Sequence, residues 1–262
     1  MPCRKNYRDL TITERERFVQ ALHHVKSTGV IDDNANLHEV HFSHGIHRSS
    51  HFLPWHRDFL RRFEDALRTY DPDVAIPYWN STEDSDTSDP LFWANEFLAE
   101  FDSAWGLGRV LGGSLPDPAT VQEALNKNSY SEFWPFLERI VHNPPHNWVG
   151  GRMATASSPA DPVFYLHHCW IDMIWAQWQL LHPSAVFESS GTGLGLNDPL
   201  MGWTTTPADV LDHRTINLYD YPPGFTEEDL PIITPPTNLV VNFMSVPQGE
   251  TRLAAAVFSL NA

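Results

Sequence analysis

The stretch HEVHFSHGIHRSSHFLPWHRDF, residues 38–59, is unusually rich in histidine. Within 19 residues it carries six: His38, His41, His44, His47, His51 and His56. Imidazole is the commonest metal ligand among protein side chains. The stretch therefore raises the hypothesis of a metal site, and the rest of the chain has to show which imidazoles face inward.

Composition bounds the class of protein. The chain has 262 residues and 42 % hydrophobic residues, which suits one large domain with a sizeable core. A net charge of −16 argues against nucleic acid and anionic membrane surfaces as partners. No apolar run reaches the roughly 18 residues of a membrane span, and the first residues lack the apolar segment of a signal peptide. We therefore expect an intracellular protein or the mature form of a secreted one.

The two cysteines, Cys3 and Cys169, are too few for a disulfide framework or a cysteine zinc site. A single bridge between them is one alternative, and two free thiols are the one we favour.

Helical patterns dominate the first 221 residues. Thr13 and Glu16 have the spacing of a capping box that opens a first helix, and Gly29 ends it. Further helices are expected at 54–70, 119–126, 129–141 and 161–181, followed by an irregular segment at 183–209.

After residue 221 prolines cluster, and two strand-like runs follow at 238–244 and 251–260. The sequence predicts a mainly α fold, a four-helix bundle core, with a small C-terminal β appendage. Residues 1–221 would form the main domain and 222–262 a linker and short β-rich extension.

Helical periodicity predicts which histidines are buried. His56 shares a 3, 4, 3, 4 spacing with apolar residues, as does His168: the two seams are His56, Phe59, Phe63, Ala66, Tyr70 and Phe164, His168, Ile171, Trp175, Trp178. His142 and His146 are four residues apart, so they share one helix face. Recurrence of inward imidazoles on separate elements of one bundle favours a metal centre over isolated core histidines.

Imidazole ligation without carboxylate or thiolate suits copper or zinc. Two histidine clusters, within 38–56 and 142–168, predict two ions. A pair of three-histidine sites suits two coppers that share an oxygen molecule. A zinc hydrolase is the alternative, although a zinc pair more often recruits carboxylates.

Two long motifs resemble the copper motifs of the tyrosinase family, the type-3 copper proteins: HRSSHFLPWHRDFLRRFE (47–64) and HNPPHNWVGGRMATASSPADPVFYLHHCWIDMIWAQWQ (142–179). The resemblance is to short microbial or fungal members and covers most of 4–221. It implies one copper held by His38, His47 and His56, and a second held by His142, His146 and His168.

The resemblance also implies roles around the coppers. Asn143 and Glu138 would hold a water that takes the phenol proton, although Asn143 followed by two prolines equally resembles a helix N-cap. His167, Asp172 and Asn80 would support the ligands, with Asn80 in place of an acidic residue.

Other features concern the edges of the site. Ser157 and Ser158 would leave the substrate entrance open. His41, His44 and His51 are expected at the surface or beside the ligands, and Gly45 stands where some relatives carry a cysteine bonded to a histidine. Tyr219-Asp220-Tyr221 resembles the tyrosine motif that closes the family's core, where Arg4 or Arg8 would bind it.

The implied activity is that of an oxidoreductase with two coppers as cofactor and O2 as co-substrate. It would oxidise small phenolic substrates, o-diphenols to o-quinones, and also hydroxylate monophenols. The alternatives are a catechol oxidase without monophenolase activity and a haemocyanin-like O2-binding protein. The natural phenol and the oligomeric state stay open.

Overall fold

The computed structural model describes residues 2–84, 92–94 and 97–222. The chain divides into a compact unit, Met1–Pro231, and a second unit, Ile232–Ala262. The expected strands at 238–244 and 251–260 lie outside the described residues, as does the extension that we predicted at 222–262, apart from its first residue. Across the described part, no helix combines the length and apolarity of a membrane span.

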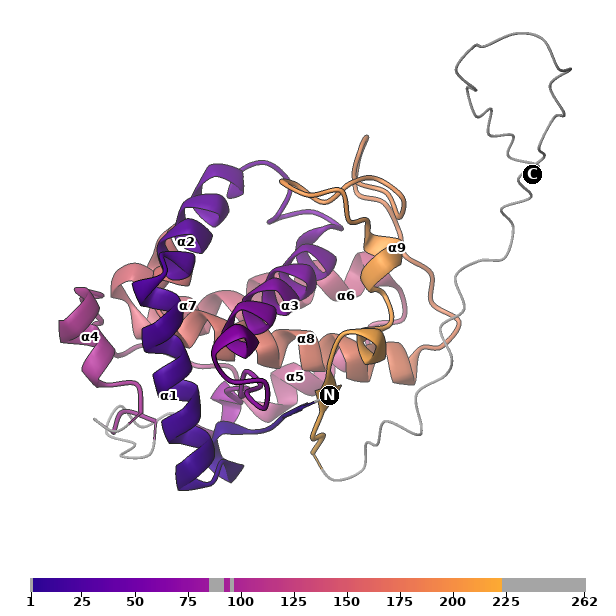
Figure 1. Cartoon of the computed structure of the whole chain (residues 1–262). Coiled ribbons are helices and arrows are strands. Elements are labelled where there is room, and N and C mark those ends of the chain that lie inside the picture. Colours follow the sequence, from indigo (N-terminus) through magenta and orange to yellow (C-terminus); the bar gives the residue numbers. More distant parts are fainter. Residues whose placement is uncertain (1, 85–91, 95–96, 223–262) are drawn as a thin grey trace, which may run out of the picture. The chain divides into compact units, whose positions relative to one another are not determined.

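The described unit is helical (Figure 1). Its helices are α1 (Ile12–Ser27), α2 (Val30–His41), α3 (Phe52–Tyr70), α4 (Glu100–Trp105), α5 (Pro118–Leu125), α6 (Tyr130–Phe136), α7 (Asn143–Val149), α8 (Val163–Leu181) and α9 (Pro207–Val210). The expected helices at 54–70, 119–126 and 161–181 are confirmed within two residues.

The start of α1 differs from the prediction. Thr11 and Glu14, not Thr13 and Glu16, form the capping box: the Thr11 hydroxyl accepts from the Glu14 N–H, and the Glu14 carboxylate accepts from the Thr11 N–H. Both pairs have the right spacing, so the motif alone does not decide between them.

Sequence reasoning missed α2 entirely. Gly29 separates α1 from α2 with a φ of 86°, a left-handed conformation that favours glycine. The buried residues of α2 are Ile31, Ala35 and His38, which have helical spacing but carry little hydrophobic signal. As a result, His38 lies on a helix rather than in a loop.

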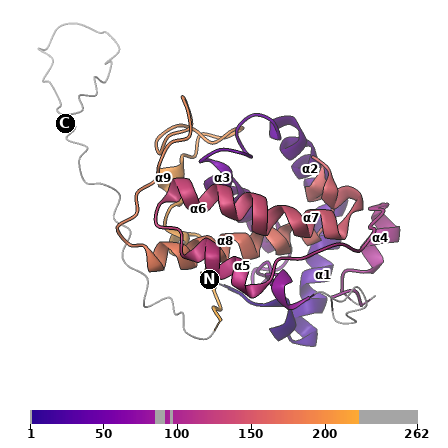
Figure 2. The same ribbon diagram turned by 180° about the vertical axis from the view of Figure 1, so that it is seen from behind.

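The segment between α6 and α7 is a π-helix, Leu137–His142, so that 130–149 forms one continuous helical stretch (Figure 2). The Asn143 N–H donates to the Glu138 carbonyl, five residues back. Pro144 and Pro145 have no N–H to donate, and a widened turn accommodates this loss. The expected N-cap at Asn143 is therefore wrong, because Asn143 has helical backbone on both sides.

α3 packs against both α1 and α8 in the core. On α8, every residue from Val163 to Trp178 is buried, so the helix has no solvent-exposed face along most of its length. On α3, His56, Phe59 and Phe63 are buried as predicted, whereas Tyr70 at the helix end is 46 % exposed.

Two short strands join the N-terminal segment to residues near the end of the described chain. β1 (Cys3–Arg4) pairs in parallel with β2 (Leu218–Tyr219), with Arg4 opposite Tyr219. The Arg4 guanidinium donates to the Tyr219 hydroxyl at 2.9 Å. Of the two arginines expected to bind the tyrosine motif, Arg4 does so. Cys3 and Cys169 are not bridged to each other, as favoured.

Candidate metal centre

Three imidazoles from two helical stretches, 130–149 and α8, converge on one point. The Nε2 atom of His142 lies 3.2 Å from that of His168 and 3.0 Å from that of His146, and the last two are 3.3 Å apart. Nitrogen donors each about 2.0 Å from one ion lie about 3.3–3.5 Å apart. The three Nε2 atoms therefore have nearly the spacing that one shared ion requires.

The opposite nitrogens of two of these rings are fixed by oxygen acceptors. His146 Nδ1 lies 2.7 Å from the Met153 carbonyl, and His142 Nδ1 lies 3.0 Å from the Asn143 side-chain oxygen. Such contacts place the proton on Nδ1 and leave the Nε2 lone pair available for a metal. The ring orientations are thus set by the protein itself.

His167 competes with His168 as the third member of this set. One ligand atom each of His142, His146 and His167 lies within 4.8 Å of the others. However, His167 Nε2 already contacts the His142 carbonyl at 3.0 Å. His168 Nε2, in contrast, lies 3.2 Å from His142 Nε2 and 3.3 Å from His146 Nε2. We therefore assign His168 to the set and His167 to its support. His167 and His168 are both buried side chains of α8, so burial alone does not distinguish them.

A second convergent set comes from α2, α3 and the segment between them. Ligand atoms of His38, His47 and His56 lie within 4.8 Å of one another. Nδ1 of His38 contacts the Ala156 carbonyl at 2.6 Å, and Nδ1 of His56 contacts the Phe52 carbonyl at 2.8 Å. Their Nε2 atoms are buried without a hydrogen-bond partner. Buried polar atoms without partners are costly, and a metal ion would satisfy both.

The two sets adjoin each other. The His56 and His168 rings are stacked at 4.2 Å with an interplanar angle of 14°, and the His47 and His142 ring centres are 6.0 Å apart. The arrangement therefore fits one dinuclear centre better than two independent sites.

Burial lowers the pKa of every ring in the two sets. The pKa values of His38 and His146 fall to about 4, and those of His47, His56, His142 and His168 fall well below the ordinary value. The principal cause is desolvation, followed for most of the rings by repulsion from neighbouring imidazoles. The rings are thus neutral at pH 7, the protonation state that metal binding requires.

Comparison with known proteins agrees with this geometry. The family model for the common central domain of tyrosinase matches residues 28–103 and 114–181. The tyrosinase of Streptomyces antibioticus is 36 % identical over 275 residues, covering 84 % of this chain and 100 % of that protein. The grixazone synthase of Streptomyces griseus is 30 % identical, covering 83 % and 98 %.

The chain belongs to the tyrosinase family. It is accordingly a copper-dependent oxidase of the tyrosinase type, with a dinuclear copper centre as its cofactor.

Solved structures share the tyrosinase fold. A functional unit of octopus hemocyanin superposes with a TM-score of 0.64 at 22 % identity, covering 84 % of this chain and 68 % of that one. A tyrosinase from Burkholderia thailandensis gives 0.61 at 19 %, covering 87 % and 76 %.

Glu138, expected to take part in catalysis, lies on the π-helix and is buried. Its two carboxylate oxygens accept from the Arg48 backbone N–H at 2.8 and 3.0 Å. Arg48 follows His47, so Glu138 anchors the segment that carries a ligand. Burial raises the pKa of Glu138 to about 7, and the Arg48 hydrogen bonds only partly oppose this shift.

Asn143 is exposed, and its side-chain oxygen contacts His142 rather than capping a helix. The residue thus orients a ligand ring. It is one residue away from the metal set, on the same helical stretch as Glu138.

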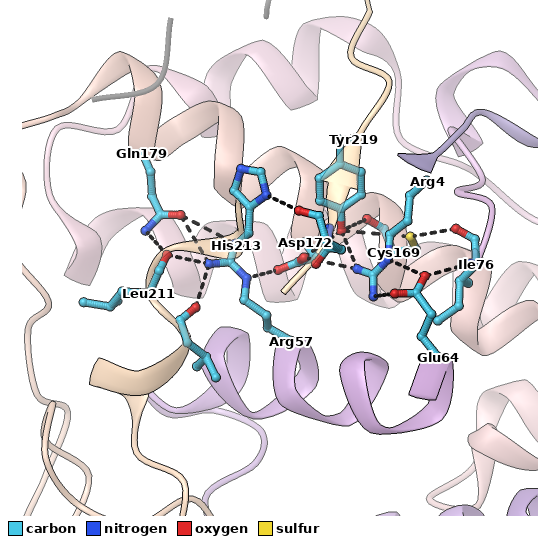
Figure 3. Close-up of polar contacts among 12 residues, drawn as sticks. Arg4, Arg57, Glu64, Ile76, Cys169, Asp172, Gln179, Leu211, His213 and Tyr219 are labelled. Carbon is cyan, nitrogen blue, oxygen red and sulfur yellow. Dashed lines mark hydrogen bonds and ion pairs between the residues drawn. The ribbon is translucent and has the colours of Figure 1, made fainter. Parts of the chain in front are cut away.

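Two expected supporting residues form hydrogen bonds with other groups. Asn80 caps a short 3-10 turn at 81–83: its side chain accepts from the Thr82 N–H and donates to the Glu83 carboxylate. Asp172 contacts Arg57 and Tyr219, both at 2.6 Å, rather than an imidazole of either set. Asp172 lies one turn after His168 on α8, and its side chain points toward Arg57 on α3 (Figure 3).

Asp172 belongs to a buried polar network that sequence reasoning recognised only in part. It links α3, α8, β1 and β2 through the side chains of Arg4, Arg57, Glu64, Cys169, Asp172, Gln179, His213 and Tyr219 (Figure 3). Arg57 adjoins His56, and Asp172 lies one turn from His168. The network therefore ties together the two helices that each supply a ligand. No sequence signal beyond the motif WHRDF indicated Arg57.

The expected entrance serines differ from each other. Ser157 is partly exposed and accepts from Arg152 at 3.3 Å, whereas Ser158 is 1 % exposed and lies within the protein. His51, expected at the surface or beside the ligands, is also buried, with Nε2 2.9 Å from the Gly195 carbonyl. His44 is exposed and His41 partly so, as expected.

Proposed function

We propose that this chain is a tyrosinase in the full sense. It oxidises o-diphenols to o-quinones with O2 and also hydroxylates monophenols at the ortho position. The observation that carries the proposal is the contact between two three-histidine sets with neutral rings. The Nε2 atoms of the second set converge, and those of His38 and His56 are buried without a partner.

The copper ligands are His38, His47 and His56 for one ion, and His142, His146 and His168 for the other. When bound, the copper pair supplies O2 activation and takes up the two electrons of the substrate. The protein holds His38, His56, His142 and His146 in the tautomer that presents Nε2, through acceptors at Nδ1, and Asn143 does this for His142.

Glu138 is the group we assign to the phenol proton. A general base works best when its pKa lies near the operating pH, and the pKa of Glu138 is about 7. Its position beside the His47 segment places it close to the centre but outside the ligand set. Small phenols are thus the proposed substrates.

A catechol oxidase without monophenolase activity is the second candidate, and one observation favours it. The Glu138 oxygens already accept from Arg48, and the Asn143 oxygen contacts His142. If neither side chain reorganises, the pair has reduced capacity to hold a water for the phenol proton.

The deciding experiment is O2 consumption by copper-loaded protein with 4-methylcatechol and with 4-methylphenol. The proposal expects uptake with both. For Glu138→Gln we expect the monophenol rate to fall about 100-fold, the lower range for loss of a general base, and the catechol rate to fall less than tenfold. Glu132→Gln, an exposed change on α6, is the matched control.

Uptake with the catechol alone would favour the catechol oxidase. No turnover of either compound, with two coppers bound, would favour an O2-binding protein. Two zinc ions per purified chain would contradict the proposal altogether.

A further inference from the structure

The open side of the metal centre can be located from burial. Of the six ligands, only His47 and His146 are partly exposed, one from each set, while the other four are buried. A substrate that reaches both ions therefore approaches past these two rings. Residues next to His47 and His146 are placed to contact the part of the substrate that stays outside.

Arg48, the residue after His47, stands out by its backbone. Its φ is 54°, and among the described residues it is the only non-glycine with a positive φ. Such a conformation is uncommon for a long side chain and is held only where surrounding contacts enforce it. Here the two hydrogen bonds to Glu138 do so, and the Arg48 side chain itself is left exposed.

The positive charge of Arg48 also acts on the metal centre. Over 2–84, 92–94 and 97–222, no carboxylate pairs with its guanidinium, because Glu138 contacts its backbone instead. Its positive charge lowers the pKa of both His47 and Glu138, so its field reaches the centre. Arg139, exposed on the π-helix, adds a second positive charge beside Glu138. In a chain of net charge −16, this is a local positive patch.

We propose that Arg48 is a specificity-determining residue that selects phenols bearing an anionic substituent, such as a carboxylate on a short side chain. The phenol ring enters past His47 while the carboxylate stays at the rim and pairs with the guanidinium. This inference rests on the proposed function, because it concerns the substrate of the same centre. It predicts the order anionic, then neutral, then cationic for otherwise similar catechols.

The test compares kcat/KM for 3-(3,4-dihydroxyphenyl)propionate, 4-ethylcatechol and dopamine. In Arg48→Gln we expect the ratio of the anionic to the neutral compound to fall about three- to fivefold, the size typical of a solvent-exposed ion pair. The change should lie mainly in KM. Arg48→Lys should retain most of the preference, and Arg214→Gln, whose partner is Asp212, is the remote control.

An unchanged ratio in Arg48→Gln would overturn the inference, as would an equal loss for all three compounds, which indicates a structural role of the turn. If Arg48→Gln does not hold copper, the unmodified protein decides. Its anionic preference must exist and must shrink in 0.5 M NaCl, because salt screens exposed charges. No turnover of any catechol would contradict the proposed function instead.

Discussion

The two histidine sets are built in different ways. In the second set, His142 and His146 lie on one continuous helical stretch, and the three Nε2 atoms are 3.0–3.3 Å apart. In the first, His38 lies in the last turn of α2, His47 on the segment between the helices and His56 in the second turn of α3. The second set is largely fixed by local backbone geometry, whereas the first depends on contacts from distant parts of the chain.

Those distant contacts are specific. Glu138 holds the Arg48 backbone, Ala156 holds His38, and Ser50 is bonded to Ser190 and to the Leu194 carbonyl. Each comes from a segment at least 90 residues away in sequence. We therefore expect substitutions far from the ligands in sequence to weaken metal binding at the first set more than at the second.

The largest effect is expected from removing a first-set ligand. His56→Ala should lose one copper and essentially all O2 uptake, because two imidazoles rarely retain a copper that needs three. Copper content per chain and catechol oxidation measure this.

His51→Ala is the matched control, since His51 is buried nearby but contacts the Gly195 carbonyl. It should retain both coppers. Loss of copper in this variant would show that the first set is misassigned.

A large effect on both sets at once is expected from Asp172→Ala. The Arg57–Asp172 ion pair is buried, with side-chain exposures of 0 % and 3 %, and it joins α3 to α8. Breaking such a pair costs about 3–5 kcal/mol, which lowers Tm by roughly 10 °C in a protein of this size. Calorimetry of the copper-free protein measures it.

Asp65→Ala removes an exposed ion pair within α3, the helix that carries Arg57, and should change Tm little. If Asp172→Ala weakens copper binding at one set only, the network does not couple the two helices as inferred.

The copper-free protein should lose stability as the pH falls from about 6.5 towards 4. The folded-state pKa values of His38 and His146 are about 4, below the ordinary 6.5, so the unfolded chain binds protons first in this range. Each contributes up to about 3 kcal/mol that is present above pH 6.5 and lost through pH 4. Denaturant midpoints at pH 7.5, 6.0 and 5.0 test this.

Copper should remove much of this dependence, because bound imidazoles resist protonation until the metal leaves. A copper-free protein equally stable at pH 7.5 and 5.0 would contradict the burial of these rings.

The smallest effect, and the one that separates the two sets most cleanly, is expected for Asn143→Ala. Loss of the contact to His142 Nδ1 should weaken the second-set copper about tenfold, the lower range for such a supporting residue. Competition with a copper chelator measures the two affinities.

Asn147→Ala, an exposed change on the same helix, is the control and should leave both affinities unchanged. A weaker first-set copper in Asn143→Ala would show that the two sets are not separable in this way.

The sequence by itself determined the helical class, most helix positions and the six candidate ligands. Periodicity works for His56 because α3 has an apolar face with helical spacing, and the motifs supplied the rest. It placed His168 on the apolar seam of α8 and His167 off that seam, whereas burial does not distinguish the two, because α8 is buried on all sides from Val163 to Trp178.

Only the tertiary structure decided how the ligands are held. The acceptors of His38 and His146, the role of Glu138 at Arg48, and the Arg57–Asp172 pair all join residues far apart in sequence or in separate elements. Local pattern carries no information on such contacts, because they arise from how helices pack. The same holds for the contact of Asn80 with Glu83 and for the burial of Ser158, which no local motif indicated.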